Sequence, residues 1–291
     1  MPLAATGTLI TEAAAAGSAI AAFNVIMLEH VEAVVAGAES VGAPVILQIS
    51  ENAVKYRYGQ LFPLARATLA AAERATVPVG CHLDHVQSDE LLRQAPEAGF
   101  SSVMYDASRL PYAENVTATR AAADWAHGQG LWIEAELGQI GGKHGQRPLD
   151  AHAPGARTDP AEARAFVAET QVDALAVAIG TSHAMTTRTA TLDHDRLRGL
   201  SATLDVPLVL HGSSGVPDDE LTKAAAGGIT KINIGTALNL ALTGAIREFL
   251  DARPEAVDSR TYLGAGREAM AAATARLITV LRGGRPSPDC W

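Results

Sequence analysis

The sequence predicts an α/β fold: a (β/α)8 barrel that forms a single domain over residues 1–291, with extra helices at its C-terminal end. Eight short apolar runs alternate with alanine-rich helical patterns. Continuous apolar runs are typical of parallel strands that are covered on both faces. The chain of 291 residues lies within the length that α/β barrels occupy as one domain.

The expected strands follow one another along the whole chain: residues 19–25, 44–50, 77–84, 101–105, 131–137, 173–180, 207–212 and 229–235. Helices are expected between them, for example at 28–42, 61–76, 112–130, 160–170 and 217–227, and after the last strand at 236–252 and 260–282. Gly42, Gly130 and Gly227 stand where helices commonly end. An open doubly wound sheet is the alternative, but residues 23–26, Phe-Asn-Val-Ile, lack its glycine-rich fingerprint.

Composition excludes several classes of function. The net charge is −9 and no basic stripe is visible, so we expect no nucleic-acid partner. No uncharged apolar stretch is long enough to cross a membrane, and Thr8, Thr11 and Glu12 interrupt any secretory leader. Two isolated cysteines, Cys81 and Cys290, indicate a reducing compartment. We therefore expect a cytoplasmic protein.

Residues 138–158 break the alternation. This segment is rich in glycine and proline and has no apolar period. Because long structureless loops in compact domains are often lids, we expect a mobile active-site loop here.

Three histidines stand where expected strands end: His85, His183 and His211. The carboxyl ends of barrel strands converge on one face, so these imidazoles can meet. Three protein ligands with an open fourth position are the arrangement of a catalytic zinc site. A histidine taken alone is more often structural, and we expect this for the others: His30, His82, His127, His152 and His194.

The remaining strand ends are unusually polar. A buried polar group without a partner costs about 1–3 kcal/mol, so this concentration predicts an active site. The residues concerned are Asn24, Ser50, Asp84, Glu136, Gly212, Ser213, Asn233, Gly235 and Thr236.

These residues stand in motifs that together resemble those of the class II, zinc-dependent ketose-bisphosphate aldolases, which cleave fructose or tagatose 1,6-bisphosphate. Together these motifs extend over essentially the whole chain. Their combination is specific to the family, although each motif alone is weak evidence. The motifs are Ala-Phe-Asn-Val at 22–25, His-Leu-Asp-His at 82–85, Pro-Tyr-Ala-Glu-Asn-Val at 111–116, Glu-Ala-Glu-Leu-Gly at 134–138, Ala-Ile-Gly-Thr-Ser-His at 178–183, His-Gly-Ser-Ser-Gly at 211–215 and Lys-Ile-Asn-Ile-Gly-Thr at 231–236.

The resemblance implies a role for each of the central residues. His85, His183 and His211 would bind Zn2+, with one ion per subunit, and the Glu136 carboxylate would lie near the metal. The zinc ion would act as a Lewis acid on the ketone half of the substrate. Asp84 would be the acid/base at the C4 hydroxyl. Asn233 would donate a hydrogen bond to the enediolate.

The resemblance also implies a pocket for the phosphate of dihydroxyacetone phosphate. The carbonyl of Gly142 would belong to this pocket, where a monovalent cation (Na+ or K+) also binds. We expect the substrate and its phosphate to contact residues at the strand ends: Asn24, Ser50, Gly180, Gly212, Ser213, Gly235 and Thr236.

Residues 258–263 resemble the family segment whose arginine reaches across a subunit boundary to the distal phosphate. This arginine would be Arg260. It implies a bisphosphate substrate and a homodimer or homotetramer.

Residues 141–145, Gly-Gly-Lys-His-Gly, depart from the family pattern. His144 stands where a glutamate is expected to abstract the C1 proton, and Gly145 replaces an acid. An imidazole with a pKa of about 6.5 can serve as the base. Equally, the loop could be adapted to another substrate, or the enzyme could catalyse the reaction slowly. Ala184-Met185 also replaces the usual glycine after the second histidine.

We therefore expect a carbon–carbon lyase of carbohydrate metabolism, for example glycolysis, acting on a small sugar phosphate. It would yield dihydroxyacetone phosphate and an aldehyde such as glyceraldehyde 3-phosphate. Four alternatives stay open. They are an aldolase for another phosphorylated substrate, such as a deoxy-keto acid phosphate of inositol catabolism, a Schiff-base aldolase using Lys231, a barrel epimerase, and a zinc-retaining sugar-phosphate-binding protein with lost or weak activity.

Overall fold

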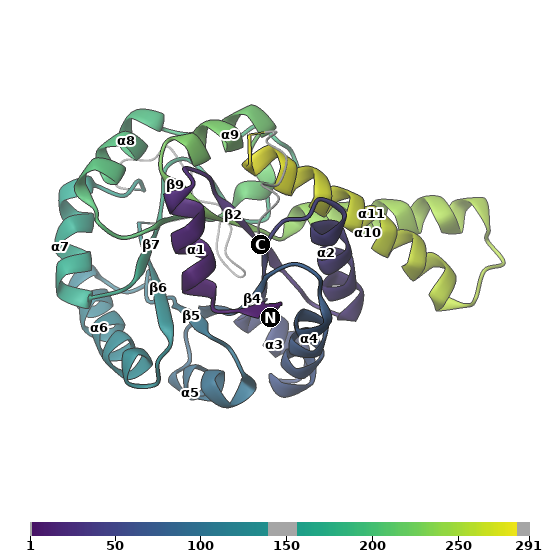
Figure 1. Ribbon diagram of the computed structural model, residues 1–291, viewed down its shortest axis with the longest axis horizontal. Coiled ribbons are helices and arrows are strands. Elements are labelled where there is room, and N and C mark those ends of the chain that lie inside the picture. The colour runs from purple at the N-terminus through teal and green to yellow at the C-terminus, as the bar shows by residue number, and fades with distance from the viewer. Residues whose placement is uncertain (1, 139–155, 284–291) are drawn as a thin grey trace.

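The computed structural model of the protein describes residues 2–138 and 156–283, and eight parallel strands in it close into a barrel (Figure 1). Each strand pairs with the next along the chain, and the last pairs with the first. This confirms the predicted (β/α)8 fold. The strands are β2 (Ile20–Asn24), β3 (Val45–Ser50), β4 (Val79–Val86), β5 (Ser102–Tyr105), β6 (Trp132–Leu137), β7 (Ala174–Val177), β8 (Leu208–Leu210) and β9 (Ile229–Ile234).

Helices surround the ring as the alternating pattern predicts (Figure 1). They are α2 (Leu28–Ser40), α4 (Phe62–Arg74), α5 (Asp89–Ala98), α6 (Tyr112–Gly128), α7 (Pro160–Thr170), α8 (His194–Thr203) and α9 (Asp218–Ala226). Gly42 and Gly130 follow their helices in the left-handed conformation, with φ of 57° and 72°. After α9, Gly228 takes that conformation at φ 112°, one residue beyond the predicted Gly227.

Two elements at the start of the chain were not predicted. β1 (Leu3–Ala4) pairs with the first residues of β4, and α1 (Thr6–Ala15) lies across the centre of the ring (Figure 1). Leu9 and Ile10 of α1 are buried in a small apolar cluster with residues at the starts of β2 and β3. The amino-terminal end of the barrel is therefore covered, which leaves the carboxyl ends of the strands for the site.

Two short helices begin directly at these carboxyl ends. They are α3 (Glu51–Tyr56), which follows β3, and the 3-10 helix η1 (Ser213–Gly215), which follows β8.

The predicted C-terminal helices α10 (Thr236–Ala252) and α11 (Ser259–Leu281) form an arm that projects beyond the barrel (Figure 1). α11 packs against α2 and α10. At Gly37 of α2 a Cβ atom would lie 2.6 Å from the carbonyl oxygen of Ala271, so only glycine permits this close helix contact. Val257, between the two helices, is 92% exposed.

Across residues 2–138 and 156–283, every helix is too short or too polar to cross a membrane. Cys81 of β4 is buried and free.

Candidate active site

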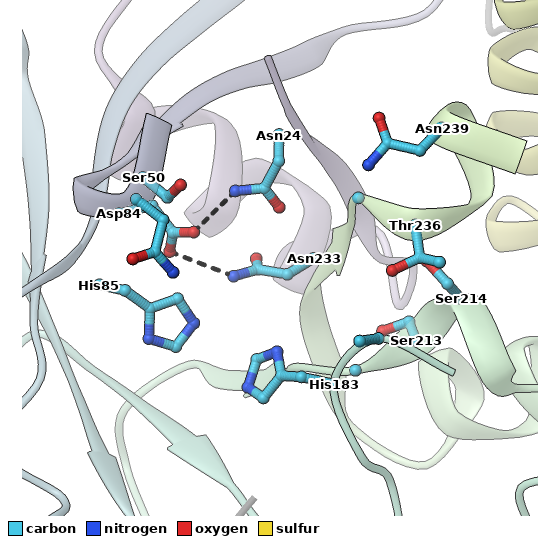
Figure 2. Close-up of a pocket in the computed structure, with 14 residues that line it drawn as sticks. Asn24, Ser50, Asp84, His85, His183, Ser213, Ser214, Asn233, Thr236 and Asn239 are labelled. Atoms are coloured by element: carbon cyan, nitrogen blue, oxygen red, sulfur yellow. Dashed lines mark hydrogen bonds between the residues drawn. The ribbon is translucent and has the colours of Figure 1, made fainter. Parts of the chain in front are cut away.

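A polar pocket of about 270 Å³ opens at the carboxyl ends of the strands (Figure 2). This volume is near the lower end of the range for ligand pockets, which fits a small polar molecule. The pocket is lined by Asn24, Ser50, Asn52, Asp84, His85, His183, Ala184, Gly212, Ser213, Ser214, Asn233, Gly235, Thr236 and Asn239.

Asp84 and His85 both face this pocket although they are neighbours in sequence. Successive side chains of a strand normally point to opposite faces. Here the β4–β5 register shifts between Leu83 and Val86, and His85 adopts the left-handed conformation at φ 51°. The irregular strand end therefore turns His85 to the same side as Asp84.

Four side chains converge at the pocket: His85 and His183, which line it, and His211 and Glu136, which are buried next to them. Their candidate ligand atoms all lie within 4.8 Å of one another. The imidazole of His85 lies with its centroid 4.8 Å from that of His211 and 5.1 Å from that of His183. Nitrogen and carboxylate donors at this spacing could hold a metal ion, and the set fits zinc.

Asp106 holds the ring of His85 from behind. Its Oδ2 atom lies 2.8 Å from Nδ1 of His85, and its Oδ1 atom accepts a hydrogen bond from the Ser108 hydroxyl at 2.6 Å. Sequence analysis missed Asp106. It directly follows the strand expected at 101–105, so the strand-end rule that found the other polar residues could have found it.

His211 lies fully buried between two carboxylates. Its Nδ1 is 3.0 Å from Oε2 of Glu136, and its Nε2 is 2.9 Å from Oε1 of Glu134. Burial alone would lower the pKa of His211, but the hydrogen bonds to Glu134 and Glu136 outweigh it and raise this pKa to about 9. Burial alone would raise the pKa of Glu134, but Lys231 and His211 hold it well below its ordinary value.

Asp84 is oriented by amide groups from two other strands. Asn24 Nδ2 donates to its Oδ2 at 2.8 Å, and Asn233 Nδ2 lies 3.5 Å from its Oδ1 (Figure 2). Burial alone would raise the pKa of Asp84, but the nearby positive charge of His85, and then of Lys231, lowers it. The carboxylate is therefore ionised, as a proton acceptor must be.

The opposite wall of the pocket is formed by η1 and the start of α10. Gly212 adopts φ 68°, and a Cβ atom there would lie 2.6 Å from the carbonyl oxygen of Ser182, so glycine is required. The backbone N–H of Ala237 donates to Ser214 Oγ at 3.0 Å and joins the two segments. Hydroxyls and a helix N-terminus on this wall suit an anion.

Ser50, a predicted substrate residue, lines the pocket and also caps a helix. Its hydroxyl oxygen accepts a hydrogen bond from the Ala53 N–H at 3.2 Å, at the start of α3.

Gly180, also predicted to contact the substrate, does not line the pocket. It adopts φ 120°, and a Cβ atom there would lie 2.5 Å from the carbonyl oxygen of Thr191, so it shapes the turn after β7.

Four pocket-lining residues were not predicted as site residues: Asn52, Ala184, Ser214 and Asn239. Asn239 lies three residues after Thr236 on α10, so helical spacing could have found it. His30, expected to be structural, is buried with its Nε2 3.1 Å from Oδ1 of Asn239.

Other predicted positions lie outside this pocket. Arg260 lies on the arm, where its side chain is 89% exposed and pairs with Asp258. Gly142, His144 and His152 lie outside the described residues. Of the expected loop, residues 139–155 also lie outside them, whereas Thr158 at its end is buried and its hydroxyl donates to the Leu137 carbonyl oxygen.

The other structural histidines have partners away from the pocket, as predicted. His82 Nδ1 lies 2.7 Å from Ser102 Oγ, His127 Nε2 lies 3.1 Å from Asp173 Oδ2, and His194 Nε2 lies 2.9 Å from Glu220 Oε2.

Comparison with known proteins identifies the family. The family model described as class II fructose-bisphosphate aldolase matches residues 4–284. The crystal structure of the YdjI aldolase from Escherichia coli K12 is 32% identical, with a TM-score of 0.81 over 96% of this chain and 97% of that chain. The fructose-bisphosphate aldolase of Campylobacter jejuni, at 22% identity, shares the fold with a TM-score of 0.80 over 96% of this chain and 95% of that chain. This chain belongs to the class II fructose-bisphosphate aldolase family, as its motifs predicted.

Proposed function

We propose that this protein is a zinc-dependent aldolase that reversibly cleaves fructose or tagatose 1,6-bisphosphate. The products are dihydroxyacetone phosphate and an aldehyde, glyceraldehyde 3-phosphate. The observation that carries the proposal is the Asp84 carboxylate, oriented by Asn24, beside three converging histidines in a polar pocket. A proton acceptor next to a metal-ligand set is what retro-aldol chemistry needs.

Asp84 would take the proton from the C4 hydroxyl as the C3–C4 bond breaks. The C4 oxygen then becomes the aldehyde carbonyl, and the electron pair of the broken bond remains on the ketone fragment as an enediolate. Asn233, whose amide nitrogen lies near Asp84, would donate a hydrogen bond to that fragment. Zinc bound by His85, His183 and His211 would supply Lewis-acid stabilisation of this negative charge, with the Glu136 carboxylate beside it. A proton must then return to the ketone fragment, and His144 is the residue that we propose for this transfer.

We propose that the phosphate of the ketone fragment binds against η1 and α10. Ser213 and Thr236 offer hydroxyl groups, and α10 is a helix of 17 residues whose N-terminus lies at the pocket. Gly212 and Gly235 allow a close approach to the backbone, and the Gly142 carbonyl would complete the pocket with a monovalent cation. A helix N-terminus stabilises an anion without a cationic side chain.

The distal phosphate would be bound by Arg260 of a second copy of the chain. No lysine or arginine lines the pocket among the described residues. Arg260 belongs to the first turn of α11, in the projecting arm, and its side chain is exposed to solvent, as the proposed contact with a second copy requires. We therefore propose a homodimer or homotetramer, and expect Arg260→Ala to raise KM for a bisphosphate with little effect on zinc content.

A second candidate is an aldolase for another phosphorylated substrate, such as a deoxy-keto acid phosphate. The described pocket lining contains no lysine or arginine, which favours a substrate with only one phosphate. The 32% identity to YdjI, whose name specifies an aldolase and no substrate, fits this candidate too.

The test is aldol cleavage by the purified protein, with fructose and tagatose 1,6-bisphosphates assayed separately. Each assay is run as isolated, after chelation and after zinc is restored. Activity lost on chelation and regained with zinc supports the proposal, and the faster sugar gives the C4 preference. Activity that survives verified metal removal would contradict the zinc mechanism. Zinc-loaded protein that cleaves neither sugar would point to the second candidate or to a binding protein.

A further inference from the structure

A buried ion pair crosses the inside of the barrel below the metal-ligand cluster. Lys231 Nζ lies 2.8 Å from Oε2 of Glu134, and both side chains are completely buried. Lys231 belongs to β9 and Glu134 to β6, with β7 and β8 between them in the ring. The pair therefore spans the barrel interior and does not join neighbouring strands.

The other oxygen of Glu134 is engaged by His211. Glu134 Oε1 lies 2.9 Å from Nε2 of His211, while Nδ1 of the same ring lies 3.0 Å from Glu136. Glu136 belongs to the candidate metal cluster, and Glu134 does not. Nδ1 of His211 thus faces the cluster, and Nε2 faces away from it.

This arrangement determines which ring nitrogen of His211 is available to a metal ion. A histidine ligand binds through a ring nitrogen that carries no proton, while the other nitrogen keeps its proton and donates it to a fixed acceptor. Glu134 and Glu136 can each accept from the ring nitrogen beside them. A metal ion in the cluster would take the place of the hydrogen on Nδ1, which faces Glu136, and leave the Nε2–H to Glu134.

We propose that Lys231 is a positioning residue, which holds Glu134 as a fixed acceptor and so directs Nδ1 of His211 to the metal cluster. Without Lys231, the Glu134 carboxylate would be buried without a counter-charge, which is strongly unfavourable. Glu134 would then rotate or draw in water and would release the imidazole ring. The inference rests on the proposed function only in needing a metal ion at the cluster.

This role differs from that of a Schiff-base nucleophile. Lys231 does not line the pocket, and its ammonium group already contacts Glu134. A nucleophilic lysine needs access to the substrate carbonyl and a neutral amine. Lys231, which the Schiff-base alternative would use as its nucleophile, therefore lies outside the pocket and acts through Glu134.

The experiment compares the metal affinity of Lys231→Met with that of the wild type. Zinc dissociation constants are measured by competition with a chromophoric chelator, and the visible spectrum of the cobalt-loaded protein reports the coordination geometry. The double variant Lys231→Met/Glu134→Gln removes both buried charges. It leaves no unpaired charge, so it tests the role of Lys231 even if the single variant fails to fold. Lys223→Met is the matched control, because Lys223 pairs with acidic residues on the exposed face of α9.

We expect Lys231→Met to weaken zinc binding by about tenfold or more and to alter the cobalt spectrum. The double variant should fold and recover part of the affinity, because a glutamine oxygen can still accept from Nε2–H. Lys223→Met should bind zinc as the wild type does. Wild-type affinity and an unchanged cobalt spectrum in both Lys231 variants would overturn the inference, as would a wild-type protein that takes up neither metal.

Sugar-phosphate cleavage is measured separately on the same samples. Weakened zinc binding in the Lys231 variants of a protein that cleaves no sugar phosphate would support the positioning role while the aldolase proposal fails. If the wild type cleaves a sugar phosphate but the Lys231 variants bind zinc unchanged, the aldolase proposal would be supported and the positioning role would fail.

Discussion

Asn24 donates a hydrogen bond to Asp84 across the mouth of the barrel, with 2.8 Å between Nδ2 and Oδ2. The two residues belong to β2 and β4, and β3 lies between these strands. The Gln48 side chain of β3 donates to Oδ1 of Asn24 at 2.9 Å, which fixes the orientation of the amide. Asn24, predicted as a substrate-binding residue, therefore also aims the proposed proton acceptor.

Replacing Asn24 by alanine tests this relationship. We expect kcat to fall by about ten- to a hundredfold, because Asp84 would lose the donor that orients it. KM and zinc content should change little. A rise in KM at unchanged kcat would show instead that Asn24 serves mainly to bind the substrate.

Replacing Asp84 by asparagine removes the proton acceptor and keeps its size. Because positioned acid–base groups contribute about 10²–10⁴-fold, we expect kcat to fall by that factor. Zinc content should match that of the wild type, which is checked by metal analysis. Near-normal turnover in the zinc-loaded variant would exclude Asp84 as the acid/base.

Asp106→Asn should weaken metal binding through His85. The asparagine keeps an oxygen 2.8 Å from Nδ1 but loses the charge that favours the orientation of the ring. Changes to such supporting residues typically cost about 10–100-fold in metal affinity. Chelator competition measures the zinc dissociation constant, and an affinity equal to the wild-type value would contradict the role of Asp106.

Gly212→Ala should damage the site more than a matched glycine change elsewhere. Gly212 and Gly17 have similar φ angles, 68° and 60°, so alanine costs about 1–2 kcal/mol of left-handed strain at either position. Only at Gly212 does the new Cβ atom meet a backbone atom, the Ser182 carbonyl oxygen at 2.6 Å. Because Ser182 precedes His183, we expect this variant alone to lose zinc affinity and activity. Urea unfolding and zinc titration check both variants, and equal losses would argue against the steric explanation.

Glu220 should stabilise the fold in a pH-dependent way. Hydrogen bonds from Lys223, and then from His194, lower the pKa of Glu220 from 4.5 to about 2. A lowered carboxyl pKa in the folded state stabilises it above the unfolded-state value, and the effect is lost as pH falls from about 4.5 towards 2. At pH 7 we expect Glu220→Gln to lower the free energy of unfolding by about 1 kcal/mol, since the group is near the surface.

The measurement for Glu220 is urea unfolding of both proteins at several pH values. The difference between wild type and variant should shrink steadily below about pH 4.5. Aldol cleavage is the control and should be unaffected, because Glu220 belongs to α9, contacts His194 of α8 and does not line the pocket. If the difference in the free energy of unfolding between the two proteins stays constant down to pH 3, ionised Glu220 does not stabilise the fold.

The sequence by itself determined the barrel and most of its site. Eight apolar runs with helical patterns between them are local signals, and the carboxyl ends of parallel strands must share one face. This strand-end rule alone predicts that Asp84, His183, His211 and Asn233 lie together. The same rule applied to the end of β5 predicts Asp106 as well.

The tertiary structure alone decided which of these residues meet. The left-handed turn at His85 brings two sequence neighbours to one side, and the width of the closed ring brings Lys231 to Glu134. Arg260 does not line the pocket of its own chain but pairs with Asp258 at the start of α11. Such pairings depend on strand stagger, backbone dihedral angles and side-chain reach across the barrel. Sequence periodicity reports which face a residue occupies but carries no information on the distance to residues of other strands.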